Sequence, residues 1–186
     1  LAKDKIKADK TIKAEVKRLT KGKHTDLEKA RAIYNFCAKD IRYVAVEYGD
    51  AGYEPHSAQD IFRNKYGDCK DQAVLLVTML KEAGLQASLV LISTKQYYNL
   101  NQDFPSALFN HCIAALYLNG KIIFLDPTAE TCSFGDLPVS DQGRRVLVFK
   151  DDTYSIEPVP FYPKEHNFIK QDLKLKTNVD ESISGV

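Results

Sequence analysis

The chain has 186 residues, of which 44% are hydrophobic and 27% are charged. This is the composition of one globular domain, long enough to bury a core. Because 26 Lys and Arg residues nearly balance 25 Asp and Glu residues, the overall charge gives no case for a nucleic acid or an anionic membrane surface as partner. No apolar run approaches the roughly 18 residues that span a bilayer. Since the first residue is Leu1 rather than Met, we expect the chain to be part of a longer protein.

The four cysteines stand far apart, at Cys37, Cys69, Cys112 and Cys132. Because the sequence has no CxxC pair and no Cys/His cluster at the spacing that zinc sites favour, it predicts no metal centre of this kind. Nothing in it implies another cofactor. An even number of cysteines in a chain of this length does not establish disulfides. The cysteines therefore do not distinguish an oxidising from a reducing compartment.

The first forty residues predict two helices. Residues 1–20 carry seven Lys and Arg side chains around a few apolar ones, which is typical of a basic amphipathic helix. Acidic residues interrupt this charge, so a solvent-exposed helix face is favoured over a polyanion-binding arm. The second helix begins at Thr25, which forms a capping box with Glu28. Its predicted apolar stripe consists of Leu27, Ala30, Ile33, Phe36, Cys37 and Ile41.

Two further helices are predicted before the first long strand. Ser57 is the expected N-cap of a short helix. Asp68 is the expected N-cap of a longer helix, which Gly84 closes in the left-handed position after its last turn. This longer helix is apolar on most sides, so we expect it at the centre of the core. Cys69 is then its first residue.

The elements predicted after residue 84 are strands. The strongest signal is Asn119-Gly120, the dipeptide that a type I′ hairpin turn requires. A polar, aromatic loop over residues 94–110 is long enough to form a functional rim. The alternating residues after Phe168 resemble a strand that begins and is cut off. Complete strands are expected at residues 85–93, 111–118, 121–126, 145–149 and 154–158.

Cys69 is a candidate nucleophile because of its place at a helix N-terminus. The positive end of the helix dipole and the free N–H groups there stabilise a thiolate. Lys70 adds to this effect, whereas Asp68 and Asp71 oppose it. Position alone therefore leaves a structural thiol as the other interpretation.

The hairpin turn determines which residues face one another. With Leu118 opposite Lys121, His111 and Asp126 become diagonal neighbours on one face, about 7 Å apart at the backbone. A carboxylate in this place holds an imidazole ready as the base for a thiol. Either residue alone is also consistent with a capped strand end and a hydrogen-bonded histidine. Cys112 falls on the opposite face, which predicts a core thiol.

Three short segments follow one another in the chain: YGDCKD at residues 66–71, NH at residues 110–111 and LDPT at residues 125–128. In this order they resemble the transglutaminase-like superfamily, whose fold is related to that of papain. The resemblance is closest to the bacterial branch, and it extends to YEP at residues 53–55 and DQGR at residues 141–144. Proteins of that branch often carry β-sandwich domains and are exported. The resemblance thus implies flanking domains and an extracytoplasmic or periplasmic location.

The resemblance also implies a role for each site residue. Cys69 is the nucleophile, His111 the general base and acid, and Asp126 the carboxylate that orients it. The backbone N–H of Cys69 is one oxyanion donor, and Gln59 and Tyr43 are the candidates for the second on side-chain chemistry. For Gln59 an exposed helix residue is the favoured interpretation. The chain has no Trp, which animal transglutaminases place beside the reactive thiol, so protein crosslinking is not predicted.

We therefore expect an α+β, papain-like domain over residues 1–165, in which the Cys69 helix packs on an antiparallel sheet. Residues 166–186 are expected to begin a truncated β segment that leads to a further domain. The predicted function is acyl transfer on peptide or protein amides by a Cys-His-Asp triad, with hydrolysis as the outcome because no feature excludes water. The alternative is a catalytically idle module that binds a peptide or glycan within a larger protein.

Overall fold

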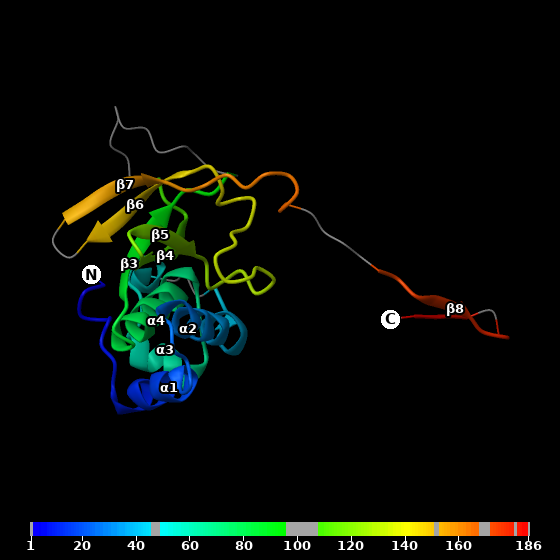
Figure 1. Cartoon of the computed structure of the whole chain (residues 1–186), viewed down its shortest axis with the longest axis horizontal. Coiled ribbons are helices and arrows are strands. Elements are labelled where there is room, and N and C mark those ends of the chain that lie inside the picture. Colours follow the sequence, from blue (N-terminus) through cyan, green and yellow to red (C-terminus); the bar gives the residue numbers. More distant parts are fainter. Residues whose placement is uncertain are drawn as a thin grey trace.

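The computed structural model describes residues 2–45, 49–95, 108–150, 153–167, 172–180 and 182–185. It has the expected α+β architecture, in which helices lie below a five-stranded sheet (Figure 1). The helices of this described part are α1 (Lys10–Thr20), α2 (Asp26–Asp40), α3 (Ala58–Asn64) and α4 (Cys69–Glu82). Helix α4 packs directly on the sheet and is also in contact with the other helices. None of the described helices is long and apolar enough to cross a membrane.

The helix boundaries follow from their caps. At α2 the Thr25 hydroxyl accepts the Glu28 N–H, and the Glu28 carboxylate accepts the Thr25 N–H, as the predicted capping box requires. Ser57 and Asp68 cap α3 and α4 as predicted. Gly84 follows α4 with a φ of 80°, which a residue with a side chain rarely adopts.

Two details of the first helices were predicted wrongly. Helix α1 does not cover the first nine residues, because the Asp9 carboxylate accepts the Ile12 N–H at 2.8 Å and starts the helix at its next residue. Ile12 and Val16 are buried, so α1 lies on the core with its lysines outward. Leu27 does not belong to the buried stripe of α2, since it is 41% exposed in the first turn.

The main sheet is antiparallel throughout its described strands, in the order β5-β4-β3-β6-β7. Different parts of the chain pack on its two faces. The face that carries Ala87, Ala114 and Leu116 packs against the helices. The other face, with Val90 and Ile113, packs under residues of the segment 137–162. The strands are β3 (Gln86–Ile92), β4 (His111–Leu118), β5 (Lys121–Leu125), β6 (Arg145–Lys150) and β7 (Thr153–Pro158).

Gln142 holds the segment that covers the second face. Its side chain is fully buried, and its amide N–H groups donate to the carbonyl of Leu137 and the side chain of Asn167, both at 2.8 Å. Its amide oxygen accepts the backbone N–H of Tyr162 at 3.1 Å. Arg144, two residues on, donates to the carbonyl of Ser93 at the end of β3. These bonds explain the buried polar residues of the DQGR segment.

Two short sheets were not predicted. Residues Arg42–Tyr43 (β1) pair in parallel with Tyr66–Gly67 (β2), which brings the start of α4 beside the end of α2. A one-turn 3₁₀ helix, Gly49–Gly52, lies between β1 and α3. In the tail, Leu175–Thr177 (β8) pairs with Ile183–Gly185 (β9), and neither joins the five-stranded sheet (Figure 1).

Some expectations fall outside the described residues. The predicted rim loop lies mostly in residues 96–107 and the start of the tail strand in residues 168–171, so both stay predictions. At the base of that loop, the side chain of Asn110 bonds to the N–H of Thr94 at 2.9 Å and to its hydroxyl at 3.0 Å. The division of the chain after residue 165 also stays a prediction.

Candidate active site

Cys69 is the first residue of α4, and Gly67 allows the chain to reach it. A Cβ atom on Gly67 would lie 2.6 Å from the Cβ of Asp71, a separation that real Cβ atoms do not show. Asp68 accepts the Asp71 N–H at 3.2 Å, and Asp71 accepts the Asp68 N–H at 3.3 Å. This reciprocal cap fixes the first turn of the helix and with it the thiol.

The two aspartates beside Cys69 have partners of their own. Lys70 forms an ion pair with the second oxygen of Asp68. Asp71 accepts the backbone N–H of His56 at 2.8 Å, and its other oxygen lies 3.1 Å from His56 Nδ1. The sequence predicts that these carboxylates oppose a thiolate. In the folded chain their oxygens are occupied by these donors. His56, a residue that the sequence did not single out, ties the YEP segment to α4.

The hairpin has the register derived from its turn. Leu118 pairs with Lys121 and Ala114 with Leu125, and both Asn119 and Gly120 have positive φ. His111 and Asp126 are therefore on one face, with His111 Nε2 3.0 Å from Asp126 Oδ2. The other oxygen of Asp126 accepts the N–H of Thr128 at 2.9 Å and its hydroxyl at 2.7 Å. The LDPT segment thus holds the carboxylate towards the imidazole.

The His111 ring lies between Asp126 and Cys69. Burial alone lowers the pKa of His111, but hydrogen bonds to Asp126 and Cys69 outweigh it and raise the pKa to about 10. The contact with His111 lowers the pKa of the Asp126 carboxyl, against its burial. Because Nε2 is engaged by Asp126, Nδ1 is the nitrogen left for Cys69. The arrangement favours an imidazolium beside the Asp126 carboxylate.

Asp141 is a buried carboxyl beside this pair, and no role was assigned to it from the sequence. Burial raises its pKa to about 6, and the charge of Asp126 acts in the same direction. One oxygen accepts the Ser140 hydroxyl at 2.9 Å, while the other is buried without a hydrogen-bond partner among the described residues. The only sequence signal for it was its place in the DQGR segment.

The side chains of His111, Asp126 and Asp141 each offer a ligand atom, and these atoms lie within 4.8 Å of one another. Such a spacing also suits a metal ion. However, Asp126 already bonds to His111 through one oxygen and to Thr128 through the other. In the described structure Asp126 is therefore engaged by His111 and Thr128, while Asp141 is bonded to Ser140.

The two oxyanion candidates are differently placed. The Gln59 side-chain amide donates to the carbonyl of Lys7 at 3.1 Å, so its donor fastens the N-terminal segment to α3. Tyr43 lies in β1 opposite Gly67 and is 42% exposed. Tyr43 thus lies on the strand next to β2, which leads directly to Cys69. The role of either residue as an oxyanion donor stays a prediction.

The other three thiols have surroundings that suppress reactivity. All four cysteines are free, and Cys69 is half-buried. Burial raises the pKa of Cys37 and of Cys112 strongly. Burial and nearby carboxylates raise the pKa of Cys132, which is also half-buried. Cys112 is in the core face, as predicted from the hairpin.

Part of the chain is similar to two curated proteins. Kyphoscoliosis peptidase from Homo sapiens is 32% identical over 106 residues, and the protein of the same name from Mus musculus is 31% identical over 106 residues. These segments cover 56% of this chain and 16% of those proteins, so the chain spans about a sixth of the curated relatives.

A solved structure shares the fold. The crystal structure of a candidate protease from Parabacteroides distasonis ATCC 8503 superposes with a TM-score of 0.66 at 17% identity, over 87% of this chain and 30% of that one. A sequence profile described as the transglutaminase-like superfamily matches residues 13–127, which include Cys69, His111 and Asp126. Since this match covers more than half of the chain, the protein belongs to the transglutaminase-like superfamily.

Proposed function

We propose that this chain cleaves peptide or protein amides by acyl transfer to the thiol of Cys69, with water as the final acceptor. The observation that carries the proposal is the continuous contact from Cys69 through His111 to Asp126. A nucleophile, a base in contact with it and a group that orients the base are what thiol catalysis requires. The amide-directed activity of the whole protein is part of the proposal, since the chain is a small share of its relatives' length.

Cys69, His111 and Asp126 have different tasks in this mechanism. The Cys69 sulfur attacks the carbonyl carbon, and the N–H of Cys69 at the start of α4 donates to the oxygen as it gains charge. When the C–N bond breaks, His111 gives its Nδ1 proton to the departing amine. Water then attacks the thioester while His111 takes up a proton from it, and Cys69 leaves as a thiolate. Asp126 keeps the imidazole in one orientation throughout.

The electrostatics of the site favour catalysis over a binding module. An imidazolium and a carboxylate that are removed from water lose solvation, and a hydrophobic pair of similar size is often at least as stable. Such a buried pair beside a half-buried thiol has an evident use when the thiol must ionise. A module that only binds a peptide or glycan has no use for this charge arrangement.

The test measures thiol reactivity and amide hydrolysis on the same samples. We expect limiting iodoacetamide at pH 6.5 to label Cys69 first, as mapped by peptide mass spectrometry, and the protein to hydrolyse denatured casein. Cys69→Ala removes the hydrolysis by about 10³-fold or more. The matched control is Cys132→Ala, because Cys132 is the other half-buried thiol, and it retains the activity.

Two results would contradict the proposal. One is a Cys69 that is labelled no faster than Cys132. The other is selective labelling of Cys69 without hydrolysis of any protein substrate, which favours the binding module. If the protein instead joins an added primary amine to the substrate, Cys69 is the nucleophile as proposed. The acceptor of the acyl group is then an amine and not water.

A further inference from the structure

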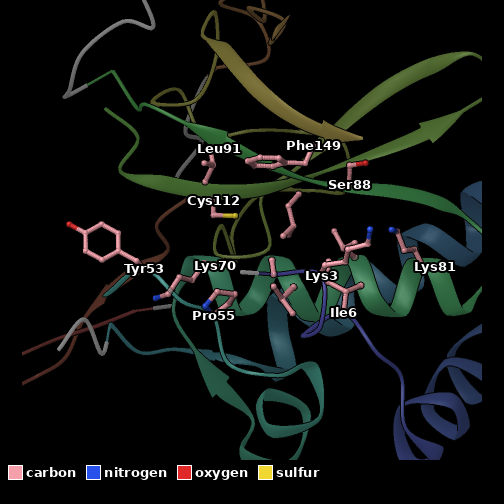
Figure 2. Close-up of a pocket in the computed structure, with 14 residues that line it drawn as sticks. Lys3, Ile6, Tyr53, Pro55, Lys70, Lys81, Ser88, Leu91, Cys112 and Phe149 are labelled. Carbon is pink, nitrogen blue, oxygen red and sulfur yellow. The ribbon is translucent and has the colours of Figure 1, made fainter. Parts of the chain in front are cut away.

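A groove of about 550 Å³ runs along α4 from the end that carries Cys69 (Figure 2). One wall is a single face of α4, formed by Lys70, Val74, Val77 and Lys81. These residues recur at helical spacing, so they form one stripe. The opposite wall is the helix-facing side of the sheet beyond the area that α4 covers, with Leu89, Leu91, Cys112 and Phe149.

The third wall is the N-terminal segment, which is bonded to residues of α3 and to Glu54. The Ala58 N–H donates to the carbonyl of Lys5 at 3.1 Å, and the Gln59 side chain donates to the carbonyl of Lys7. The ammonium of Lys5 lies 2.8 Å from Glu54, beside Tyr53 and Pro55 of the groove. Gln59 thus stabilises the groove wall. The wall is a built part of the domain, because backbone and side-chain bonds both hold it.

One end of the groove lies beside the candidate active site. Lys70, which lines the groove, directly follows Cys69 at the start of α4, and Cys112 lines the groove on β4, next to His111 in the chain but on the other face of the sheet. Burial raises the pKa of Cys112, and the charge on Cys69 is the next cause in the same direction, so the two thiols are close. In Figure 2 the thiol of Cys112 lies on the groove side of the sheet, towards the Lys70 end. A chain that leaves the groove at its Lys70 end therefore comes beside the candidate nucleophile.

The charges of the groove have one sign. Among the described residues that line it, the charged side chains are Lys3, Lys70 and Lys81. Lys70 is paired with Asp68 at the Cys69 end. In Figure 2, Lys3 and Lys81 lie toward the other end, near Ser88, with apolar side chains between the two ends. Phe149 is 41% exposed in this stretch. The groove thus combines an apolar middle with a cationic far end.

The length of the groove sets the length of its occupant. Lys70 and Lys81 are three helical turns apart, which is about 16 Å at about 1.5 Å per residue. An extended peptide covers this distance with about five residues at about 3.3 Å each.

From this geometry we infer that the groove binds an extended stretch of the substrate polypeptide, with apolar side chains in its middle and an acidic side chain about five residues from the amide that Cys69 attacks. The inference rests on the proposed function only in where it places the scissile amide. Carboxylate recognition by Lys81 and apolar contact with Phe149 are properties of the groove itself.

Binding is measured on the Cys69→Ala protein, so that its outcome does not depend on thiol chemistry. The probes are fluorescein-labelled hexapeptide amides with Leu, Val and Phe in the middle and Glu, Gln or Lys at the first or at the last position. We expect that in one of these two series, by fluorescence anisotropy, the Glu peptide binds about 3–10-fold more tightly than the Gln peptide and the Lys peptide binds most weakly.

Two pairs of variants assign the binding to the groove. Lys81→Glu reverses the order of the Glu and Lys peptides, whereas Lys39→Glu does not, although both lysines are exposed in the last turn of a helix. Phe149→Ala weakens all peptides of the preferred series by about 3–10-fold. Its control is Tyr154→Ala, an exposed aromatic that pairs with Phe149 across β6 and β7 but does not line the groove.

Several results would overturn the inference. They are no binding of any peptide, an order of affinities that Lys81→Glu leaves unchanged, and an effect that Lys39→Glu shares. A dimer in sedimentation that Phe149→Ala dissociates would assign the groove to a second copy of the chain. If instead the peptides bind in the expected order while Cys69 proves unreactive, the groove inference stands and only the proposed hydrolysis fails.

Discussion

The Nε2 atom of His111 lies 3.0 Å from Oδ2 of Asp126. The two residues are fifteen positions apart in the sequence and meet at the open end of the hairpin. Asp126 is held in this direction because Thr128 bonds to its other oxygen through both N–H and hydroxyl. The Nε2 atom is thereby engaged by the carboxylate, which leaves Nδ1 as the ring nitrogen available to Cys69. The pair sets the orientation of the ring before any substrate binds.

Asp126→Asn should slow the alkylation of Cys69 and the hydrolysis of amides by about 10²-fold or more. The amide keeps the shape of the carboxylate but removes the charge that helps to raise the pKa of His111, so this pKa falls. Rates of iodoacetamide labelling between pH 5 and 9 measure this. Glu130→Gln, an exposed change in the same loop, should leave the profile unchanged. An unchanged profile in Asp126→Asn would remove Asp126 from the mechanism.

Asp141→Asn should gain stability relative to the wild type as the pH rises from about 4 to 7. The pKa of Asp141 is about 6 in the folded chain against 3.8 for a free carboxyl, so the folded state binds more protons between these values. The stability that neutral Asp141 contributes is full below pH 3.8 and is lost as the pH rises through 6. An Asn stays neutral at every pH.

Urea unfolding at pH 4.5 and pH 7 measures the difference between the two proteins at each pH. Asp136→Asn is the control, since Asp136 is exposed in the same segment. If the difference between Asp141→Asn and wild type is equal at the two pH values, Asp141 is not the group that ionises in this window.

Gly67→Ala should destabilise the domain by about 1–3 kcal/mol and also slow Cys69 labelling. The new methyl would overlap with the Cβ of Asp71, which is backbone-fixed in the first turn of α4, so the helix start must move. Gly120→Ala is the comparison: its Cβ meets open space, but its φ of 73° strains the turn. We expect Gly120→Ala to lower the free energy of unfolding without changing the labelling of the folded protein. Normal labelling of Gly67→Ala would show that the clash is absorbed away from the thiol.

Gln142→Ala should lower the free energy of unfolding by about 2–4 kcal/mol, as measured in urea. The change leaves the carbonyl of Leu137 and the N–H of Tyr162 without the partners that Gln142 provides, in a place from which water is excluded. Gln86→Ala, an exposed glutamine in β3, should cost far less. A similar loss for both variants would contradict the role of Gln142 in holding the segment over the sheet.

Local features of the fold were predictable from the sequence because their causes lie within a few residues. Thr25, Ser57 and Asp68 start helices by bonding to N–H groups three residues away. Asn119 and Gly120 set the hairpin register, since a two-residue turn leaves one pairing for every residue that follows. The contact between His111 and Asp126 follows from that register. The start expected for α1 was too early, because the Asp9 carboxylate caps the helix at Lys10. The pattern of basic residues did not indicate this cap.

The sequence by itself thus determined the helix that begins at Cys69, the hairpin, and the side-by-side placement of His111 and Asp126. Only the tertiary structure decided what meets these elements. It brings Cys69 to His111 and buries Asp141 next to Asp126. It also uses Gln59 to fasten the wall of a groove. The physical reason is range: caps and turns depend on bonds between near neighbours, whereas these contacts depend on how α4 packs on the sheet and where distant loops cross it.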